Sequence, residues 1–324
     1  MRVLILGAAG MIGGKLAAQL AREGHLAGQE IEHMTLFDRT LASAPPQARI
    51  PVEVSSGDLS QAGQAEQLLA TQPTVIFHLA AIVSGEAERD FDTGYRVNLD
   101  GTRLLLEAIR AAGDCPKLIF TSSIAVFGPP YPESISDEFH LAPRTSYGTQ
   151  KAICELLISD YSRRGFVDGL ALRFPTICVR PGKPNGAASS FFSSIIREPL
   201  QGLQAVLPVG EEIQHWHASP RAAVGFLLHA AALDNSVLGP HRALSLPGVT
   251  VSVGEQIAAL RRVAGDQVAQ RIVRQPDPFI QRIVGDWPHR FDAQRAQQLG
   301  FRAETNFDEI IRVHIEDELQ GVIR

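Results

Sequence analysis

The chain has 324 residues, of which 45% are hydrophobic and 20% charged, and a formal net charge of −5. This composition is ordinary for a soluble globular protein with two domains, or one domain and a cap. The slight acidic excess argues against nucleic acid as the main partner, and no apolar run predicts a membrane span. The three cysteines, Cys115, Cys154 and Cys178, have no paired spacing, so we expect reduced thiols in a cytoplasmic protein.

Short apolar runs and helical patterns alternate through the first half of the chain. The apolar runs predict strands at 2–6, 34–37, 52–54, 74–79, 117–120 and 170–174. Apolar residues three or four positions apart predict helices at 11–23, 99–112 and 147–161. This alternation predicts an α/β fold, a doubly wound parallel sheet of Rossmann type with helices on both faces.

The pattern changes after Phe174, where prolines and glycines become frequent. We interpret this region as a loop-rich, smaller C-terminal cap that binds the substrate. A helix predicted at 222–233 is expected to return to the first domain. The predicted domains are therefore 1–174 with 218–244 for NAD binding, and 175–217 with 245–324 for the cap.

The first strand leads into a glycine loop with GxxGxxG spacing. Small residues let the backbone approach a pyrophosphate, and the amides of the following helix N-terminus point at it. The alternative is a tight strand-to-helix turn that binds nothing. The predicted cofactor contacts in this loop are Gly7, Gly10, Met11, Ile12 and Gly13.

Two acidic residues follow the second and third strands. Asp38 can hold the ribose hydroxyls of NAD and repel the 2′-phosphate of NADP, although Arg39 beside it could hold that phosphate instead. Asp58, followed by Leu59, could meet the adenine edge, or could simply cap a helix. We therefore predict NAD as the cofactor.

Tyr147 and Lys151 are spaced by one helical turn. An ammonium on the same helix face favours the phenolate and lowers a tyrosine pKa from its usual value of about 10. Such a pair can take a proton from a substrate hydroxyl while a hydride leaves the same carbon. The alternative is a helix start with an incidental exposed lysine.

Polar residues at the end of the fifth predicted strand complete the candidate site. A hydroxyl of Ser122 or Ser123 there can stabilise charge on a substrate oxygen, or can only satisfy the backbone. Asn98 could hold a water that relays protons from Lys151, or could cap a helix.

These motifs, with His78-Leu79-Ala80-Ala81 and Gly101-Thr102, resemble the extended short-chain dehydrogenase/reductases over roughly residues 1–180. The resemblance implies a catalytic triad of Ser123, Tyr147 and Lys151, with Asn98 as fourth member. Ser123 is preferred because it lies four residues before Phe127, where the family has Ser-x-x-Val-Tyr-Gly. The resemblance also implies a homodimer through the helices at 99–112 and 147–161. Further implied cofactor contacts are Leu79, Ala80, Ala81, Asn98, Tyr147, Lys151 and Pro175.

The chain also departs from this family at two places. Ile124-Ala125-Val126 follows the serine where dehydratases carry an acidic pair, which argues against dehydration. The family stretch that accompanies sugar-nucleotide binding is changed at 214–221. His215 and His217 in this stretch lack companions at metal-ligand spacing, so no metal is predicted.

Segments 80–84, 161–169 and 180–185 are similar to those of the D-erythronate dehydrogenase family, whose members oxidise the C2 hydroxyl of a four-carbon sugar acid with NAD. The predicted function is this oxidation, with a small sugar acid as the substrate. Two rivals stay open: a sugar-nucleotide epimerase, and a non-catalytic dinucleotide-sensing regulator. The predicted substrate contacts are Ser84, Ser123, Tyr147, Arg180 and Lys183, with Arg173 and Arg197 as further cations for the carboxylate.

Overall fold

The computed structural model describes residues 1–182 and 188–324. The chain forms two compact units, each built from three chain segments. Unit 1 comprises Met1–Val126, Leu141–Arg173 and Val224–Ser245, and unit 2 comprises Phe127–His140, Phe174–Ala223 and Leu246–Arg324. Within the described ranges, no helix is both long and apolar enough to cross a membrane.

Unit 1 contains a seven-stranded sheet in the order β12-β8-β7-β6-β1-β4-β5. Its central pairs are parallel, with Leu6 of β1 opposite His78 of β6 and His78 opposite Phe120 of β7. Chain order reverses between β1 and β6, which is where ligands bind in doubly wound sheets. The predicted fold class is confirmed. The strands are β1 (Arg2–Leu6), β4 (His33–Asp38), β5 (Val52–Ser56), β6 (Val75–His78), β7 (Lys117–Ser123), β8 (Asp168–Phe174) and β12 (Ala243–Ser245).

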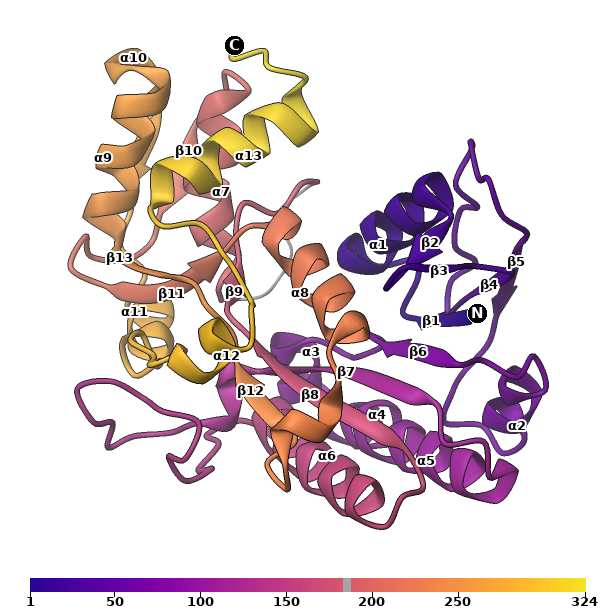
Figure 1. Cartoon of the computed structure of the whole chain (residues 1–324). Coiled ribbons are helices and arrows are strands. Elements are labelled where there is room, and N and C mark those ends of the chain that lie inside the picture. Colours follow the sequence, from indigo (N-terminus) through magenta and orange to yellow (C-terminus); the bar gives the residue numbers. More distant parts are fainter. Residues whose placement is uncertain (183–187) are drawn as a thin grey trace. The chain divides into compact units, whose positions relative to one another are not determined.

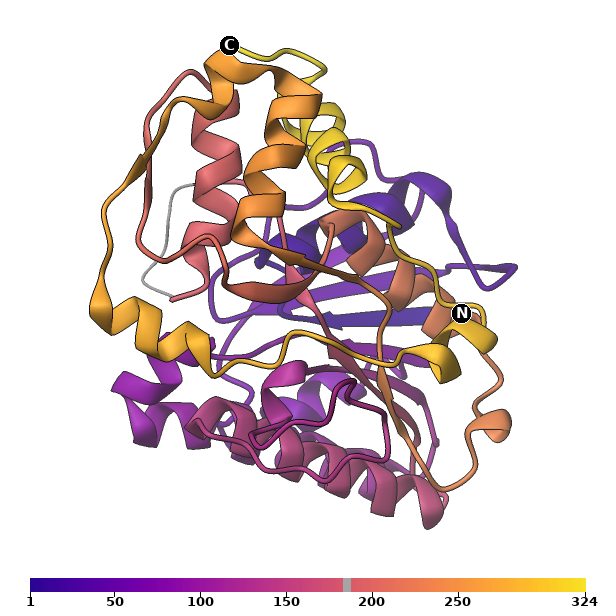
Figure 2. The same cartoon turned by 90° about the vertical axis from the view of Figure 1, so that its left-hand side faces the viewer.

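Helices cover both faces of this sheet (Figures 1 and 2). Helices α2, α5 and α6 pack side by side on one face, and α1 covers the other. Buried aliphatic side chains such as Leu4, Ile76 and Leu118 form the core beneath α5 and α6. The helices of unit 1 are α1 (Met11–Glu23), α2 (Gln64–Leu69), α3 (Ser84–Arg89), α4 (Phe91–Gly94), α5 (Gly101–Ala112) and α6 (Ser146–Arg163), with the 3₁₀ turns η2 (Ile124–Val126) and η3 (Asn235–Leu238) and the short strands β2 (His25–Leu26) and β3 (Gln29–Glu30).

Two features of unit 1 differ from the prediction. The helix expected over 99–112 begins only at Gly101, because Tyr95–Asp100 form a π-helix, η1, that contains Asn98. A π-helical turn has no distinct period in so short a segment, and such turns are frequent at functional sites. The three-residue strand β12, which pairs with β8, was too short to predict. Helix α8 (Pro220–Ala232) matches the helix expected at 222–233.

Unit 2 is more regular than the loop-rich cap that was expected. It contains a three-stranded sheet of β9 (Thr176–Ile177), β11 (Gln214–Ala218) and β13 (Val249–Ser252), and a pair formed by β10 (Ala205–Leu207) and β14 (Ile272–Arg274). Helix α9 begins with a capping box between Ser252 and Glu255, a local pattern that is typical of helix starts. The helices are α7 (Ser190–Leu200), α9 (Val253–Ala264), α10 (Asp266–Ala269), α11 (Pro278–Gly285), α12 (Gln294–Gln298) and α13 (Phe307–Leu319).

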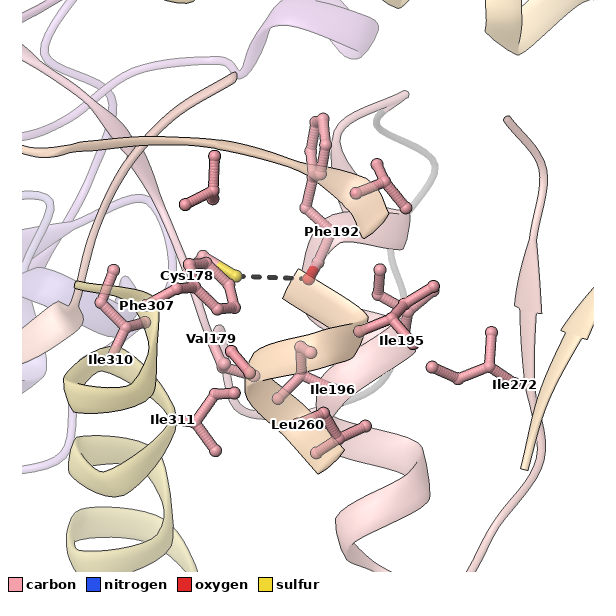
Figure 3. Close-up of a cluster of buried hydrophobic side chains, with 14 of the residues drawn as sticks. Cys178, Val179, Phe192, Ile195, Ile196, Leu260, Ile272, Phe307, Ile310 and Ile311 are labelled. Carbon is pink, nitrogen blue, oxygen red and sulfur yellow. Dashed lines mark hydrogen bonds between the residues drawn. The ribbon is translucent and has the colours of Figure 1, made fainter. Parts of the chain in front are cut away.

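The core of unit 2 forms where α7, α9 and α13 meet (Figure 3). Side chains such as Ile195, Leu260 and Ile311 are fully buried there. The Cys178 thiol donates to the Phe192 carbonyl oxygen at 3.3 Å. Burial raises the pKa of Cys178 to about 12, so its thiol is neutral and serves packing.

Candidate active site

The glycine loop of unit 1 is a cradle that side chains would fill. Gly7 has a φ of +89°, and a Cβ there would lie 2.6 Å from the Ala80 amide nitrogen. A Cβ on Gly13 would lie 2.2 Å from the Gly7 carbonyl oxygen. Within the described structure, no side chain caps the N-terminus of α1 at Gly10. Its amides therefore suit a pyrophosphate, and Gly7 brings the loop against Ala80, another predicted contact.

Asp38 ends β4 beside this loop. Its Oδ2 accepts the Ala9 amide at 2.9 Å, and its Oδ1 lies 3.5 Å from the Thr40 amide. The carboxylate thus connects the end of β4 to the glycine loop while remaining partly accessible. Arg39 beside it is exposed. This is the position from which a carboxylate can hold a ribose.

Asp58 belongs to a polar cluster after β5. It accepts hydrogen bonds from the amide and hydroxyl of Ser60, at 3.0 and 2.6 Å, and from the Arg96 guanidinium. Burial alone would raise the pKa of Asp58, but the bonds from Ser60 and Arg96 outweigh it and lower the pKa. Leu59 beside it packs into the core below α2 and α5. Asp58 is thus already engaged, and its predicted contact with adenine stays a prediction.

The two serines at the end of β7 have different surroundings. Ser122 is buried and donates to Glu155, whose carboxylate also pairs with the buried Arg173 at 2.8 Å. Ser123 accepts the Ala125 amide at 3.1 Å, and its own hydroxyl hydrogen has no acceptor among the described residues. This difference supports Ser123 as the serine that contacts a substrate oxygen.

The first turn of helix α6 lies against Ala125, two residues after Ser123, because glycine at position 148 allows a close approach. Thr145 caps the helix by accepting the Gly148 amide at 3.1 Å. A Cβ on Gly148 would lie 2.1 Å from the Ala125 carbonyl oxygen, so any side chain there would push the helix away. Tyr147 precedes this glycine in the first turn, so its position depends on the same approach.

Lys151 lies one turn further along α6 and is only 2% exposed. Its Nζ donates to the Thr121 carbonyl oxygen at 2.7 Å and lies 4.4 Å from the centre of the Phe120 ring. It also lies 5.7 Å from the centre of the Tyr147 ring. Burial of the ammonium lowers the pKa of Lys151 to about 8. Tyr147 and Lys151 therefore lie close together as predicted, and the Lys151 ammonium is buried rather than exposed.

Asn98 is enclosed by hydrogen bonds. Its Oδ1 accepts the Ile82 amide at 2.7 Å, and its Nδ2 donates to the Ile82 carbonyl oxygen at 3.0 Å and to Gln150 Oε1 at 2.7 Å. Its own carbonyl oxygen accepts the Thr102 hydroxyl at 2.7 Å and the Cys154 thiol at 3.4 Å. Both amide hydrogens are thus committed, and the predicted proton-relay water would need another anchor.

The predicted substrate contacts are divided between the units. Ser84 opens α3 in unit 1, whereas Arg180 belongs to unit 2, where it donates to Ile177 and Ser189. Lys183 lies outside the described residues. Of the further candidates, Arg173 pairs with Glu155, and Arg197 is buried beside Glu198. Pro175, between β8 and β9, also belongs to unit 2.

Unit 1 therefore gathers most of the predicted site at the carboxyl ends of its strands. The glycine loop, Asp38, the segment after β6, the end of β7 and the start of α6 all lie there. Met11, Ile12, Leu79 and Ala81 belong to these same segments. Sequence reasoning missed the polar partners beneath them: Gln150, Glu155 and the roles of His78 and Thr102 in hydrogen bonding. Only the spacing of Glu155, four residues after Lys151, could have indicated one of these partners.

The fold and this arrangement define a class. A Rossmann sheet with a glycine cradle at its switch point, and with a buried lysine one turn after a tyrosine, is the arrangement of an oxidoreductase that uses a dinucleotide.

Comparison with known proteins narrows this class. A model of the NAD dependent epimerase/dehydratase family matches residues 3–220. The chain is 50% identical to D-erythronate dehydrogenase from Cupriavidus necator over 321 residues, which cover 98% of each chain. It is 42% identical to D-erythronate dehydrogenase from Haemophilus influenzae over 98% of this chain and 100% of that one. A crystal structure described as the nucleoside-diphosphate-sugar epimerase from Agrobacterium tumefaciens has 58% identity and a TM-score of 0.98, covering 100% of this chain and 96% of that one.

The chain belongs to the NAD dependent epimerase/dehydratase family. It is an enzyme of the short-chain dehydrogenase type that uses a nicotinamide dinucleotide, which confirms the extended short-chain dehydrogenase/reductase resemblance.

Proposed function

We propose that this protein oxidises the C2 hydroxyl of a small sugar acid, such as D-erythronate, to the 2-oxo acid with NAD. The observation that carries the proposal is the buried Lys151 ammonium beside the Tyr147 ring and the end of β7. Two relatives named D-erythronate dehydrogenase, which match nearly the whole chain, support the substrate class.

We assign the cofactor to unit 1. The cradle at Gly7, Gly10 and Gly13 fits a pyrophosphate, because a Cβ at Gly7 or Gly13 would collide with the backbone. Asp38 would hold the adenosine ribose, and Lys151 the nicotinamide ribose with N–H groups beyond the one that it donates to Thr121. The bound dinucleotide supplies the hydride acceptor.

The residues of the site would then divide the acid–base work. Tyr147, as phenolate, takes the proton of the C2 hydroxyl, and the buried Lys151 charge favours that phenolate. Ser123 donates its hydroxyl hydrogen to the same substrate oxygen and orients it. Loss of the C2 hydrogen as hydride then leaves a carbonyl at C2. We assign the substrate carboxylate to Arg180 or Lys183.

Cofactor choice can be tested at Asp38. Its carboxylate would face the 2′-phosphate of NADP, and like charges at short range repel. We expect a higher kcat/KM with NAD than with NADP, and Asp38→Asn should narrow that preference by about tenfold, which equals 1.4 kcal/mol. Equal kcat/KM values with NAD and NADP in the parent enzyme would indicate that Arg39, rather than Asp38, determines the choice of cofactor.

We also propose a homodimer through α5 and α6. Leu156 on α6 is 64% exposed, which a partner helix would cover. Light scattering should give twice the chain mass for the parent enzyme and a lower mass for Leu156→Glu. A monomeric parent protein would contradict the proposal.

A sugar-nucleotide epimerase is the second candidate. The crystal structure at 58% identity, described as a nucleoside-diphosphate-sugar epimerase, favours it. An epimerase would keep its dinucleotide bound and produce no net NADH. Against it, His215 and His217 in the changed segment 214–221 point into the core of unit 2, where they contact Thr176 and Gln256.

One experiment separates the two candidates. NADH formation is followed by its absorbance across four- to six-carbon sugar acids, and the same enzyme is assayed for interconversion of UDP-glucose and UDP-galactose. We expect NADH with a four-carbon acid and no interconversion. Interconversion without NADH would replace the proposed function with epimerisation, and neither activity would reject both.

A further inference from the structure

A chain of hydrogen bonds runs beneath the loop that follows β6. His78 ends this strand and is 1% exposed. Its Nε2 lies 2.9 Å from the Thr102 hydroxyl oxygen, which lies 2.7 Å from the Asn98 carbonyl oxygen. Because that carbonyl can only accept, the hydroxyl hydrogen must lie between Thr102 and Asn98. His78 therefore carries a hydrogen on Nε2 and donates it to Thr102.

The surroundings keep His78 in this one form. Burial, and then the Lys151 ammonium, lower the pKa of His78 to about 3, so the ring is neutral at physiological pH. Its Nδ1 has no hydrogen-bond partner within the described ranges. The edge of the ring packs on Phe120, with the ring centres 5.4 Å apart. A buried acceptor without a partner, such as this Nδ1, is rare. We therefore interpret the ring orientation as one that preserves the hydrogen bond from Nε2 to Thr102.

The other end of the chain reaches the predicted base. Asn98 holds both the amide and the carbonyl oxygen of Ile82 through its side chain. Ile82 is buried with Ala87 and Val97, and Tyr147 packs against this group. The segment 79–84 is thus fixed by His78 at its start and by Ile82 near its end.

We infer that His78, acting through Thr102, is a positioning residue that fixes Asn98 and with it the segment 79–84 and the Tyr147 ring. The inference rests on the proposed function, since Leu79, Ala80 and Ala81 of this segment are predicted cofactor contacts and Ser84 is a predicted substrate contact. His78 itself donates no proton to the substrate, because the single N–H group of its neutral ring donates to Thr102.

Matched variants separate the hydrogen bond from the packing. Thr102→Val keeps the shape and removes the hydroxyl, whereas Thr102→Ser keeps the hydroxyl. His78→Leu removes the donor, whereas the amide nitrogen of His78→Gln can replace the ring Nε2. We expect kcat/KM for the sugar acid to fall about 10- to 100-fold in Thr102→Val and His78→Leu, because small misplacements are costly. Thr102→Ser and His78→Gln should stay within about threefold of the parent enzyme, well short of the 100-fold cost of a displaced group.

The double variant His78→Leu/Thr102→Val should lose no more activity than either single variant, since both remove the same interaction. All rates are taken per folded molecule, well below the unfolding midpoint measured by circular dichroism. Unchanged kcat/KM in Thr102→Val, or an equal loss in His78→Gln and His78→Leu, would overturn the inference. If His78→Leu does not fold, the Thr102 pair decides alone.

A binding measurement makes the test independent of catalysis. ADP-ribose carries the adenosine and pyrophosphate but lacks the nicotinamide. We expect Thr102→Val to bind ADP-ribose with unchanged Kd and NAD with a Kd raised severalfold, whereas equal effects on both ligands would contradict the inference. If the parent enzyme oxidises no sugar acid, the proposed function fails, and this comparison still decides the role of His78.

Discussion

Two buried polar regions of this protein are built in opposite ways. In unit 2, the rings of His215 and His217 pack against Phe192, and each Nε2 meets a side chain, Thr176 Oγ1 at 2.6 Å and Gln256 Nε2 at 2.9 Å. Burial lowers the pKa of His215 to about 3 and that of His217 well below its usual value, so this region is neutral.

The region at the ends of β6 and β7 in unit 1 retains a charge. Among the described residues, the Lys151 ammonium has one hydrogen-bond partner, the Thr121 carbonyl oxygen, and two aromatic neighbours. Burying a charge without a counterion in contact costs much more free energy than burying a neutral polar group. The comparison teaches that incomplete satisfaction of a buried cation, rather than burial of polar residues as such, distinguishes the candidate active site from a polar core.

The largest expected effect tests the site of unit 1 directly. Tyr147→Phe removes only a hydroxyl, so we expect kcat to fall by about 10²- to 10⁴-fold while the fold and NAD affinity persist. Tyr161→Phe on the same helix is the control, because Tyr161 donates to Glu107 and lies outside the site. Steady-state kinetics check both variants. Near-parent activity of Tyr147→Phe on sugar acids would remove Tyr147 as the base.

The second prediction concerns the buried Lys151 charge and its effect on activity and on the free energy of unfolding. Lys151→Met should reduce kcat by about 100-fold and weaken NAD, because one ammonium is assigned to both the phenolate and the ribose. Replacing a buried charge with an apolar group is often neutral or stabilising, so the free energy of unfolding should not fall. Urea titration and NAD binding check this. A clear loss of stability with normal NAD binding would make Lys151 structural.

Whether the sequence could predict a feature of these regions depends on how far apart in the chain the interacting residues lie. Gly7, Gly13 and the spacing of Tyr147 and Lys151 are local patterns, and all of them lie in unit 1 near the strand ends. The pairing of Glu155 with Arg173, or of Asn98 with Ile82, depends on how helix and strand pack, which no local pattern reports. Arg173 was accordingly expected to meet a substrate carboxylate, although its guanidinium pairs with Glu155.

A third prediction concerns the stability of the protein at acid pH, to which buried histidines of both regions contribute. His78, His215 and His217 are neutral when folded, but each would protonate near pH 6.5 when unfolded. Between pH 6.5 and about 3, the unfolded chain binds protons at His78 and His215 that the folded chain excludes, and the lowered pKa of His217 acts in the same direction. The free energy of unfolding is therefore greatest above pH 6.5. It decreases as the pH is lowered, by about 1.4 kcal/mol per pH unit for each histidine. Urea titrations from pH 7.5 to 5 check the slope, which His78→Gln should reduce because it removes one of these three histidines.

The smallest effect is expected in the core of unit 2. Gln256→Met removes the side-chain partner of His217 and should lower the free energy of unfolding by about 1–2 kcal/mol. Because this cluster is neutral and takes no part in the proposed acid–base chemistry, kcat should match that of the parent enzyme. Thermal unfolding and steady-state kinetics provide the measurements. A tenfold loss of kcat in a folded variant would show that the polar core of unit 2 also serves catalysis.

The order in which the segments of unit 1 are synthesised has its own consequence. Strand β12 is the edge of the main sheet beside β8, yet the ribosome makes it only after residues 174–223, which belong to unit 2. Until Ser245 emerges, β8 presents an open edge, a known route to aggregation in nascent chains. A fragment ending after β8 would keep that edge permanently, so cutting the gene at residue 174 cannot yield an isolated dinucleotide-binding unit with its complete sheet.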